Sequence, residues 1–338
     1  MVPVKIGFIG CGGHGSFMQS FIRKIADLEL VAVCDIDAVK AKKNARDFGV
    51  PECYTDYREM LAKTTAEVIA VIGTPQMHSG IGVDVLNAGK NLFVEKPLGV
   101  DLADCRRLLE AAQKSGKIVM NGYMWRYANP LARMRAISRT PEFGKPLSMH
   151  IRFLTPQPRF CIWGLDDMLA TCVITDGGHP IDIATTMMGP VEALCAHLAN
   201  GDGGVTSLIV ALQFANGGVG TLHVGTCTSG VDLDFVLTSS KGYTIKLQDN
   251  MNRLFYAASD NVDYQNVPIV EGWYPAPLTV SDADHTGWTA ELTALAQCVR
   301  ENKQPENDMR AGYEVMRVQQ AVKISFTEKR EVKIADLQ

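Results

Sequence analysis

The sequence predicts two domains: a doubly wound α/β domain over residues 1–124 and an α+β domain over residues 125–338, whose large, mostly antiparallel sheet leaves one face open. Three observations support this prediction. The length of 338 residues exceeds that of an average single domain. Short apolar runs alternate with amphipathic stretches in the first third of the chain. Longer strand-like runs, joined by glycine-containing turns, follow residue 125.

The first domain is predicted from continuous apolar runs, which are typical of parallel strands buried on both faces. The expected strands are Val4 to Ile9, Leu30 to Cys34, Val68 to Ile72, Asn91 to Val94 and Ile118 to Met120. Helical patterns lie between them, and one is clear at Leu102 to Ser115, where Asp101 is placed as its cap. Strand–helix–strand alternation at this spacing predicts right-handed crossovers and a parallel sheet.

The second domain is predicted from longer alternating runs. The expected strands are Leu147 to Leu154, Val191 to Leu198, Val205 to Phe214, Val219 to Val224, Leu233 to Thr238 and Tyr243 to Leu247. Asn216-Gly217-Gly218 and Ser240-Lys241-Gly242 join two neighbouring pairs, and such turns are typical of antiparallel hairpins. Helical patterns occur at Pro180 to Met188, Gly287 to Arg300 and Gly312 to Phe326, so the domain is expected to be α+β.

The overall composition excludes several functional classes. Lys and Arg number 33 against 37 Asp and Glu, so no global basic field would hold a nucleic acid. No apolar run approaches the roughly 18 residues of a membrane helix, and the N-terminus does not resemble a signal peptide. The nine cysteines contain no C-x-x-C pair, which indicates free thiols in a reducing compartment. We expect a cytoplasmic protein without nucleic-acid or membrane partners.

A glycine-rich turn after the first strand gives the first functional signal. Residues 10–15 read Gly-Cys-Gly-Gly-His-Gly and fit the pattern G-x-G-x-x-G. In this pattern Gly10 permits a tight turn, Gly12 lets backbone N–H groups approach a pyrophosphate, and Gly15 lets helix and strand pack closely. Lys and Ser or Thr do not follow the turn, so the phosphate loop of a nucleoside triphosphatase is not expected.

An acidic residue identifies the expected nucleotide. Asp35 follows the second expected strand, where its carboxylate would accept hydrogen bonds from an adenosine ribose 2′-hydroxyl. A 2′-phosphate would meet a negative charge there, which favours NAD over NADP. Strand, glycine turn, helix and acidic residue together predict a Rossmann dinucleotide-binding domain with NAD as cofactor.

A second signal, Val94-Glu95-Lys96-Pro97, follows the strand that ends at Val94. A lysine at the C-terminal end of a sheet strand points toward the cleft where ligands bind. With three further motifs, the chain resembles the Gfo/Idh/MocA family of glucose-fructose oxidoreductase, inositol dehydrogenase and rhizopine-catabolism type enzymes over essentially its whole length. Those motifs are Gly73-Thr74-Pro75-Gln76-Met77-His78, Trp125-Arg126-Tyr127-Ala128-Asn129-Pro130 and Gly178-His179-Pro180-Ile181-Asp182.

The resemblance implies roles for individual residues. In the family, the Glu-Lys-Pro lysine contacts the nicotinamide or its ribose and the reacting hydroxyl, a role that falls on Lys96. His179 matches the catalytic histidine, and Asp182 matches the family's H-x-x-D pattern and is expected near the substrate. The residues expected at the cofactor are Gly10, Gly12, Gly13, His14, Gly15, Asp35, Thr74, Pro75, His78, Glu95, Lys96 and Arg126.

Oxidation of an alcohol requires such a set. A base must take the hydroxyl proton while hydride leaves the carbon, and histidine is suited to this near neutral pH. A lysine ammonium beside the same oxygen would stabilise the developing alkoxide. We therefore expect a dehydrogenase or reductase of a sugar, cyclic polyol or sugar derivative, with His179 as base and Lys96 as electrostatic partner. Arg152 and Trp163 are further substrate candidates, because polar tips and aromatic faces suit polyols.

The sequence departs from the family pattern just before the histidine. Many members carry an Asp four residues upstream, whereas Thr175 stands there in this chain and Asp176 lies three upstream. Either Asp176 substitutes for it or Thr175 hydrogen-bonds the substrate, so the third catalytic role stays open. Two other functions also remain open: NAD-recycling cleavage of a glycoside through a transient 3-keto sugar, and a non-catalytic sensor of sugar or NAD.

Two further expectations concern metals and assembly. His179 and Asp182 have metal-ligand spacing but no third ligand at a suitable distance in sequence, so no metal is expected. The second domain's sheet would expose alternating apolar side chains from Val205 to Phe214 on its uncovered face. We therefore expect a homodimer or homotetramer.

Overall fold

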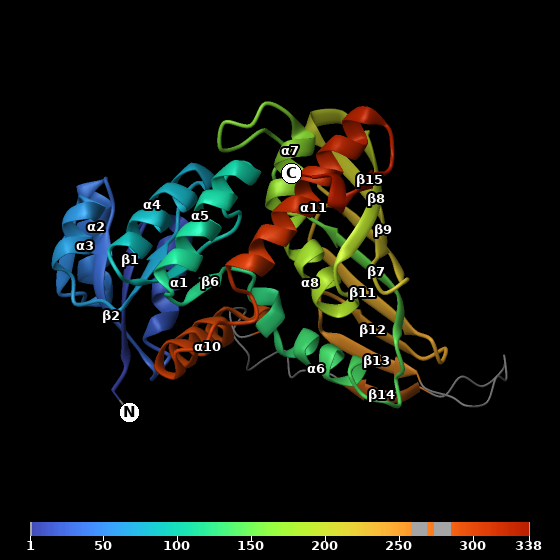
Figure 1. Ribbon diagram of the computed structural model, residues 1–338, viewed down its shortest axis with the longest axis horizontal. Helices are drawn as coiled ribbons and strands as arrows, with labels where there is room; N and C mark the ends of the chain where they lie inside the picture. The colour runs from blue at the N-terminus through green and yellow to red at the C-terminus, as the bar shows by residue number, and fades with distance from the viewer. Residues whose placement is uncertain (1, 258–268, 274–284, 338) are drawn as a thin grey trace. The chain divides into compact units, whose positions relative to one another are not determined.

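The chain folds into two compact units, each built from two separate chain segments (Figure 1). The first comprises Met1–Met124 and Thr286–Met316, and the second comprises Trp125–His285 and Arg317–Gln338. The structure is a computed structural model that describes residues 2–257, 269–273 and 285–337, with residues 269–273 described by their backbone alone.

The first unit is a parallel α/β sheet, as the sequence predicts. Its described strands run in the order β3-β2-β1-β4-β5-β6, and the order reverses between β1 and β4. The strands are β1 (Val4–Ile9), β2 (Leu28–Cys34), β3 (Glu52–Tyr54), β4 (Val68–Val71), β5 (Asn91–Val94) and β6 (Val119–Asn121). The crossover helices are α1 (Gly13–Ile22), α2 (Ala38–Phe48), α3 (Tyr57–Lys63), α4 (Pro75–Asn87) and α5 (Leu102–Ser115). The strand order places a topological switch point beside the turn after β1.

The observed units differ from the predicted division into 1–124 and 125–338, because a second chain segment belongs to the first unit. Helix α10 (Trp288–Glu301) and the first turns of α11 (Met309–Glu328) belong to this unit. Asn121 donates its backbone N–H to the Asn307 carbonyl over 3.0 Å, and the Asn307 amide donates back to the Asn121 carbonyl. Met309 and Met316 are buried in the aliphatic core of this unit. An amphipathic pattern predicts a helix but not the surface on which the helix packs. The sequence therefore could not show that residues 286–316 pack with the first unit.

The second unit is a mixed, mostly antiparallel sheet, as predicted. Its described strands run in the order β14-β13-β12-β11-β7-β10-β9-β8-β15, and β7 with β10 is the parallel pair. The strands are β7 (Pro146–Leu154), β8 (Val191–Asn200), β9 (Thr206–Phe214), β10 (Val219–Gly225), β11 (Asp232–Ser239), β12 (Thr244–Gln248), β13 (Arg253–Ala257), β14 (Ile269–Trp273) and β15 (Val332–Lys333). Both predicted hairpins, β9 with β10 and β11 with β12, are confirmed.

Helices cover one face of this sheet. They are α6 (Asn129–Ser138), α7 (Met168–Thr175) and α8 (Gly178–Met188), preceded by the single turn η1 (Met124–Tyr127); further single turns are η2 (Asp202–Gly204) and η3 (Ile334–Asp336). Helix α8 packs on β7 and β10, α7 on β9 and α6 on β12. Along β9, Leu208, Val210 and Leu212 are buried, whereas Ile209 between them is exposed on the other face. The covered face therefore carries the core of this unit.

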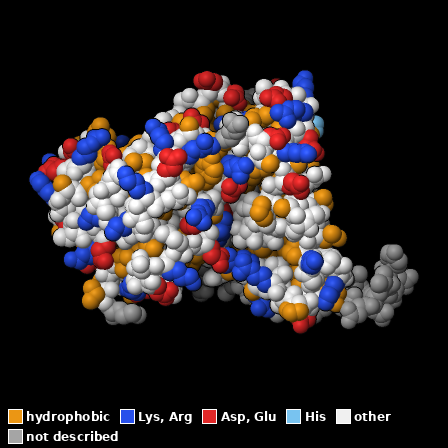
Figure 2. Space-filling view, in the orientation of Figure 1, with side chains coloured by type: hydrophobic (Ala, Val, Ile, Leu, Met, Phe, Trp, Pro, Cys, Tyr) orange, Lys and Arg blue, Asp and Glu red, His pale blue; other side chains and the backbone are white. Residues whose placement is uncertain are grey.

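The surface carries both charge signs. Figure 2 shows Lys and Arg interspersed with Asp and Glu on the visible face of either unit. In the described residues, no helix combines the length and the apolar character needed to cross a membrane.

Candidate functional site

The glycine turn after β1 contains two kinds of glycine. Gly10 has φ of 110°, and a Cβ there would lie 1.8 Å from the Ile72 carbonyl oxygen. A Cβ at Gly15 would lie 2.2 Å from the Gly10 carbonyl oxygen. At Gly12 and Gly13, by contrast, a Cβ would have no described atom within 4 Å. Gly10 and Gly15 therefore shape the turn, whereas Gly12 and Gly13 leave space beside it.

The N-terminus of α1 opens onto this space. The helix starts at Gly13 after its N-cap Gly12, and no side chain among the described residues caps it. Its first N–H groups can therefore meet an anion. Asp35 follows β2, where its carboxylate accepts hydrogen bonds from the Cys11 and Asp37 backbone N–H groups over 2.8 and 2.9 Å. Open space, helix N-terminus and fixed carboxylate together fit an adenine dinucleotide.

Glu95 and Lys96 follow β5. The buried Glu95 carboxylate accepts a hydrogen bond from the Lys96 backbone N–H over 3.0 Å, and its other oxygen lies 3.3 Å from His14 Nε2. A Cβ at Gly122 would approach this carboxyl to 2.7 Å, so a glycine there makes room for it. Burial raises the pKa of Glu95, but His14 and then Lys96 outweigh that effect and hold the pKa below its ordinary value. Glu95 is thus a buried anion linked to the glycine turn.

His78 is a structural link between two loops. Its Nδ1 lies 2.6 Å from the Pro97 carbonyl oxygen, and its Nε2 accepts the Gly73 N–H over 3.1 Å. These partners fit a neutral imidazole that donates from Nδ1, and burial lowers the pKa of this side chain. Thr74 is the N-cap of α4 and Pro75 its first residue. Because β4 pairs with β5, the structure brings this loop and the Lys96 loop to one edge of the sheet.

His179 lies in the first turn of α8, in the second unit. The face of its ring stacks on Trp125 of η1, with ring centroids 4.9 Å apart and planes inclined by 28°. Arg126, which follows Trp125 in η1, donates from Nε to both Asp182 carboxylate oxygens over 2.9 and 2.8 Å. Both partners are buried; burial raises the pKa of Asp182, and the Arg126 guanidinium opposes that rise. The structure therefore pairs Arg126 and Asp182 with each other.

Thr175 and Asp176 end helix α7, shortly before His179. The Thr175 hydroxyl donates to the Thr171 carbonyl oxygen over 2.8 Å, one turn back in the same helix. The Asp176 carboxylate accepts a hydrogen bond from the Thr155 hydroxyl at 3.5 Å. Both side chains are buried.

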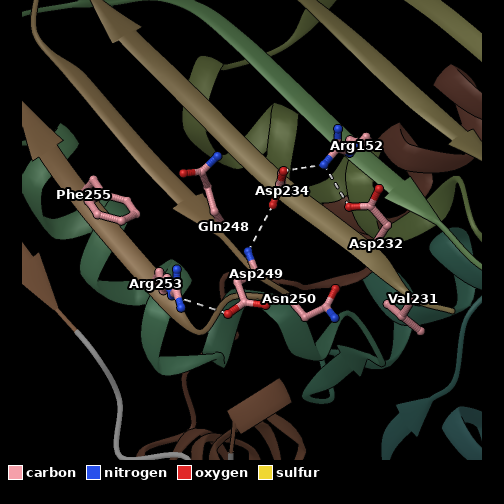
Figure 3. A pocket seen from close by; sticks show the side chains of 9 residues that line it. All are labelled: Arg152, Val231, Asp232, Asp234, Gln248, Asp249, Asn250, Arg253 and Phe255. Carbon is pink, nitrogen blue, oxygen red and sulfur yellow. Dashed lines mark hydrogen bonds and ion pairs between the residues drawn. The ribbon is translucent and has the colours of Figure 1, made fainter.

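The structure does not bring Arg152 together with His179. On β7 the neighbouring Phe153 packs against Trp125 on the helix-covered face, so Arg152 projects from the opposite face. There it donates to Asp232 and Asp234 over 2.9 and 2.6 Å (Figure 3). It lines an open, polar hollow of about 510 Å³. Trp163 lies in the loop between β7 and α7, partly exposed and with φ of 55°.

The sequence did not indicate two of these contacts. His14 with Glu95 and Trp125 with His179 each join residues from distant parts of the chain. Trp125 and Arg126 do stand in a motif singled out from the sequence, but their partners depend on the fold. Among the described residues, no three His, Cys, Asp or Glu side chains are grouped as a metal site requires.

Comparisons with known proteins agree with this architecture. The family model GFO_IDH_MocA, described as an oxidoreductase family with an NAD-binding Rossmann fold, matches residues 4–123, and the model of the GFO/IDH/MocA C-terminal domain matches residues 131–245. Inositol 2-dehydrogenase of Salmonella typhimurium is 36% identical over 154 residues, which cover 45% of this chain and 46% of that one. Myo-inositol 2-dehydrogenase of Thermotoga maritima is 25% identical over 257 residues, or 71% and 74% of the two chains. The chain thus matches about half the length of the first of these relatives.

Solved structures share the fold. A dehydrogenase from Chromobacterium violaceum superimposes with a TM-score of 0.89 at 23% identity, covering 97% of this chain and 96% of that one. Levoglucosan dehydrogenase in complex with NADH has a TM-score of 0.87 at 18% identity, covering 98% and 99%.

Proposed function

Because this chain belongs to the Gfo/Idh/MocA oxidoreductase family, we propose that it is an NAD-dependent dehydrogenase or reductase of a sugar, cyclic polyol or sugar derivative. The observation that carries the proposal is the grouping in the first unit. An open glycine turn, the Asp35 carboxylate and the Lys96 loop lie at the carboxyl ends of β1, β2 and β5 in one sheet. The relatives named inositol 2-dehydrogenase support a polyol as substrate class.

The first unit's residues would hold the cofactor. Backbone N–H groups at Gly12, Gly13 and His14 would meet the pyrophosphate at the start of α1, and Asp35 would accept hydrogen bonds from the adenosine ribose. The Thr74 to His78 loop and Glu95 would border the nicotinamide half. When bound, NAD accepts the hydride that leaves the carbinol carbon.

Two side chains would act on the substrate hydroxyl: one accepts its proton, and the other stabilises the negative charge on its oxygen. The His179 imidazole takes the hydroxyl proton as general base, a role worth about 10²- to 10⁴-fold in rate. In the role that the family resemblance implies, the Lys96 ammonium stabilises the negative charge that develops on the substrate oxygen, which contributes about 3 kcal/mol for a well-placed donor. In reduction, the protonated His179 returns the proton.

For the third catalytic role we propose Asp176 rather than Thr175. The Thr175 hydroxyl already donates to the Thr171 carbonyl oxygen within α7. Asp176 stands at the helix end, three residues before His179, and carries an acceptor suited to a substrate hydroxyl. Asp176→Asn would then reduce turnover by about tenfold or more, whereas Thr175→Val would leave it within a few-fold.

The test is NADH formation with a panel of inositols, aldoses, uronates and glycosides. Lys96→Ala and His179→Ala should each reduce turnover by about 10²-fold or more while NAD binding is retained. Lys114→Ala and His150→Ala, at exposed positions of the two units, are matched controls that should keep wild-type rates. Full activity in either Lys96→Ala or His179→Ala would refute the assignment.

Product analysis of the same mixtures separates the alternatives. Consumption of a glycoside without NADH accumulation would indicate redox-assisted cleavage in place of a simple dehydrogenase. Tight NAD binding without hydride transfer to any member of the panel would indicate a sensor.

A further inference from the structure

We propose that Trp125 is a positioning residue that holds the His179 ring in its working orientation. The inference rests on the proposed function of His179 and goes beyond it, because it names the side chain that orients the base. All of the residues that carry it lie in the second unit.

Trp125 is itself fixed by the sheet. Its side chain is 4% exposed. Phe153 of β7 meets it edge to face at 4.9 Å and 79°, and Phe235 of β11 does so at 5.8 Å and 81°. Such edge contacts restrain the indole more than aliphatic packing would. The indole also stacks on the His179 ring. A rigid chain of aromatic contacts therefore runs from the sheet to His179.

The adjacent residue makes a second attachment to the same helix. Arg126 pairs with Asp182, which lies one turn beyond His179 on α8. Two successive residues of η1 thus engage two successive turns of α8, one through an aromatic face and one through an ion pair. This arrangement limits rotation of α8 about its axis as well as rotation of the imidazole about its side-chain bonds.

The stacking also has an electrostatic consequence. A general base must present its nitrogen within hydrogen-bond reach of the hydroxyl, and it carries a positive charge after proton transfer. An aromatic face stabilises that imidazolium. The charged residues of η1, of α8 and of the end of α7 are Arg126, Asp182 and Asp176. Every variant below keeps these three charged residues, so a change in the titration of His179 reports on the indole.

The experiment compares Trp125→Leu with Trp125→Phe. Trp125→Leu removes the aromatic face and should lower kcat by about tenfold or more while KM for NAD is unchanged. It should also move the low-pH limb of the kcat profile to lower pH, because the imidazolium loses its aromatic partner. Trp125→Phe keeps an aromatic face and should restore kcat to within about threefold of wild type. Phe143→Leu, a buried aromatic residue elsewhere in the second unit, is the control for lost packing and should leave the pH profile unchanged.

A readout independent of turnover separates failure of this inference from failure of the proposed function. In ¹⁵N-histidine NMR, the His179 imidazole should titrate at lower pH in Trp125→Leu than in wild type, whether or not a substrate is known. An unchanged titration together with unchanged kcat would overturn the inference. If Trp125→Leu does not fold, the same measurements on Phe153→Leu, which removes one edge contact to the indole, serve instead. Absence of turnover in the wild type would count against the proposed function alone.

Discussion

At the scale of single residues, the buried imidazole of His78 links stability to pH. His78 is fully buried as a neutral imidazole, with both ring nitrogens engaged by backbone groups. Burial lowers its pKa from the ordinary value of 6.5. Below pH 6.5 the unfolded chain therefore binds a proton that the folded chain rejects, so the free energy of unfolding decreases as the pH falls.

This gives a prediction for the pH dependence of stability. Between pH 6.5 and the lower folded-state pKa, the His78 contribution should change by up to about 1.4 kcal/mol per pH unit. Urea unfolding at several pH values should show a shallower slope in His78→Gln than in wild type. His197→Gln, at an exposed strand position, should keep the wild-type slope. Equal slopes in all three proteins would mean that folding does not lower the pKa of His78.

The Arg126 and Asp182 pair gives a second prediction. Both side chains are buried, so Asp182→Asn leaves the Arg126 charge without its carboxylate partner. We expect a loss of about 3–5 kcal/mol in the free energy of unfolding. Glu328→Gln breaks a half-exposed pair with Arg330 and should cost less than about 1 kcal/mol. Denaturant unfolding of the two variants tests this, and equal losses would argue against a buried charge pair.

The sequence predicted the roles of residues that depend on other residues nearby in the sequence. Gly10 and Gly15 have the turn and packing roles that their motif implies, and Asp35 follows a strand as expected. The sequence did not predict contacts between residues far apart in it, such as His14 with Glu95 or Trp125 with His179. Those pairs exist only once the sheet has fixed its strand order.

At the scale of elements, the start of α1 separates structural from functional glycines. A Cβ at Gly12 meets no described atom within 4 Å, whereas a Cβ at Gly10 collides with the Ile72 carbonyl. Gly12→Ala should therefore leave the unfolding free energy of the ligand-free protein within about 0.5 kcal/mol. It should weaken NAD binding by about tenfold or more, because the methyl group occupies space that the pyrophosphate needs.

Gly10→Ala is the matched comparison and should fail to fold or lose several kcal/mol. Calorimetric titration with NAD, alongside thermal unfolding, distinguishes the two effects. Undiminished NAD affinity in Gly12→Ala would place the pyrophosphate elsewhere.

Helices with an amphipathic pattern and capping residues at both ends were predictable from the sequence, and a helix without an amphipathic pattern was not. Helix α5 has the predicted limits because Asp101 caps its start and Gly116, with φ of 64°, ends it. Helix α7 has Asp167 as its N-cap, but seven of its eight residues are buried, so the sequence shows no amphipathic pattern there. An apolar run of this length favours a helix and a strand equally until its neighbours are known.

At the scale of the whole molecule, the sheet face of the second unit that lies opposite the described helices bears on assembly. Ile209 is 40% exposed and Val219 51% exposed on strands whose other face is packed against helices. We predict a homodimer or homotetramer, measured by light scattering at micromolar concentration. Ile209→Glu should shift the mass toward the monomer. Val39→Glu, at a 77% exposed position of the first unit, should not. A monomeric wild type would contradict the prediction.

The two-segment construction of the first unit sets an order of events during synthesis. The six strands of the first unit are synthesised before the second unit, yet Asn121 lacks its Asn307 partner and the core lacks Met309 and Met316 until residues 307–316 have been made. The second unit's strands from β7 to β14 emerge in the meantime. The first unit thus begins before the second unit and is completed after most of it, so a nascent chain that stalls before residue 300 exposes an unfinished core to chaperones and proteases.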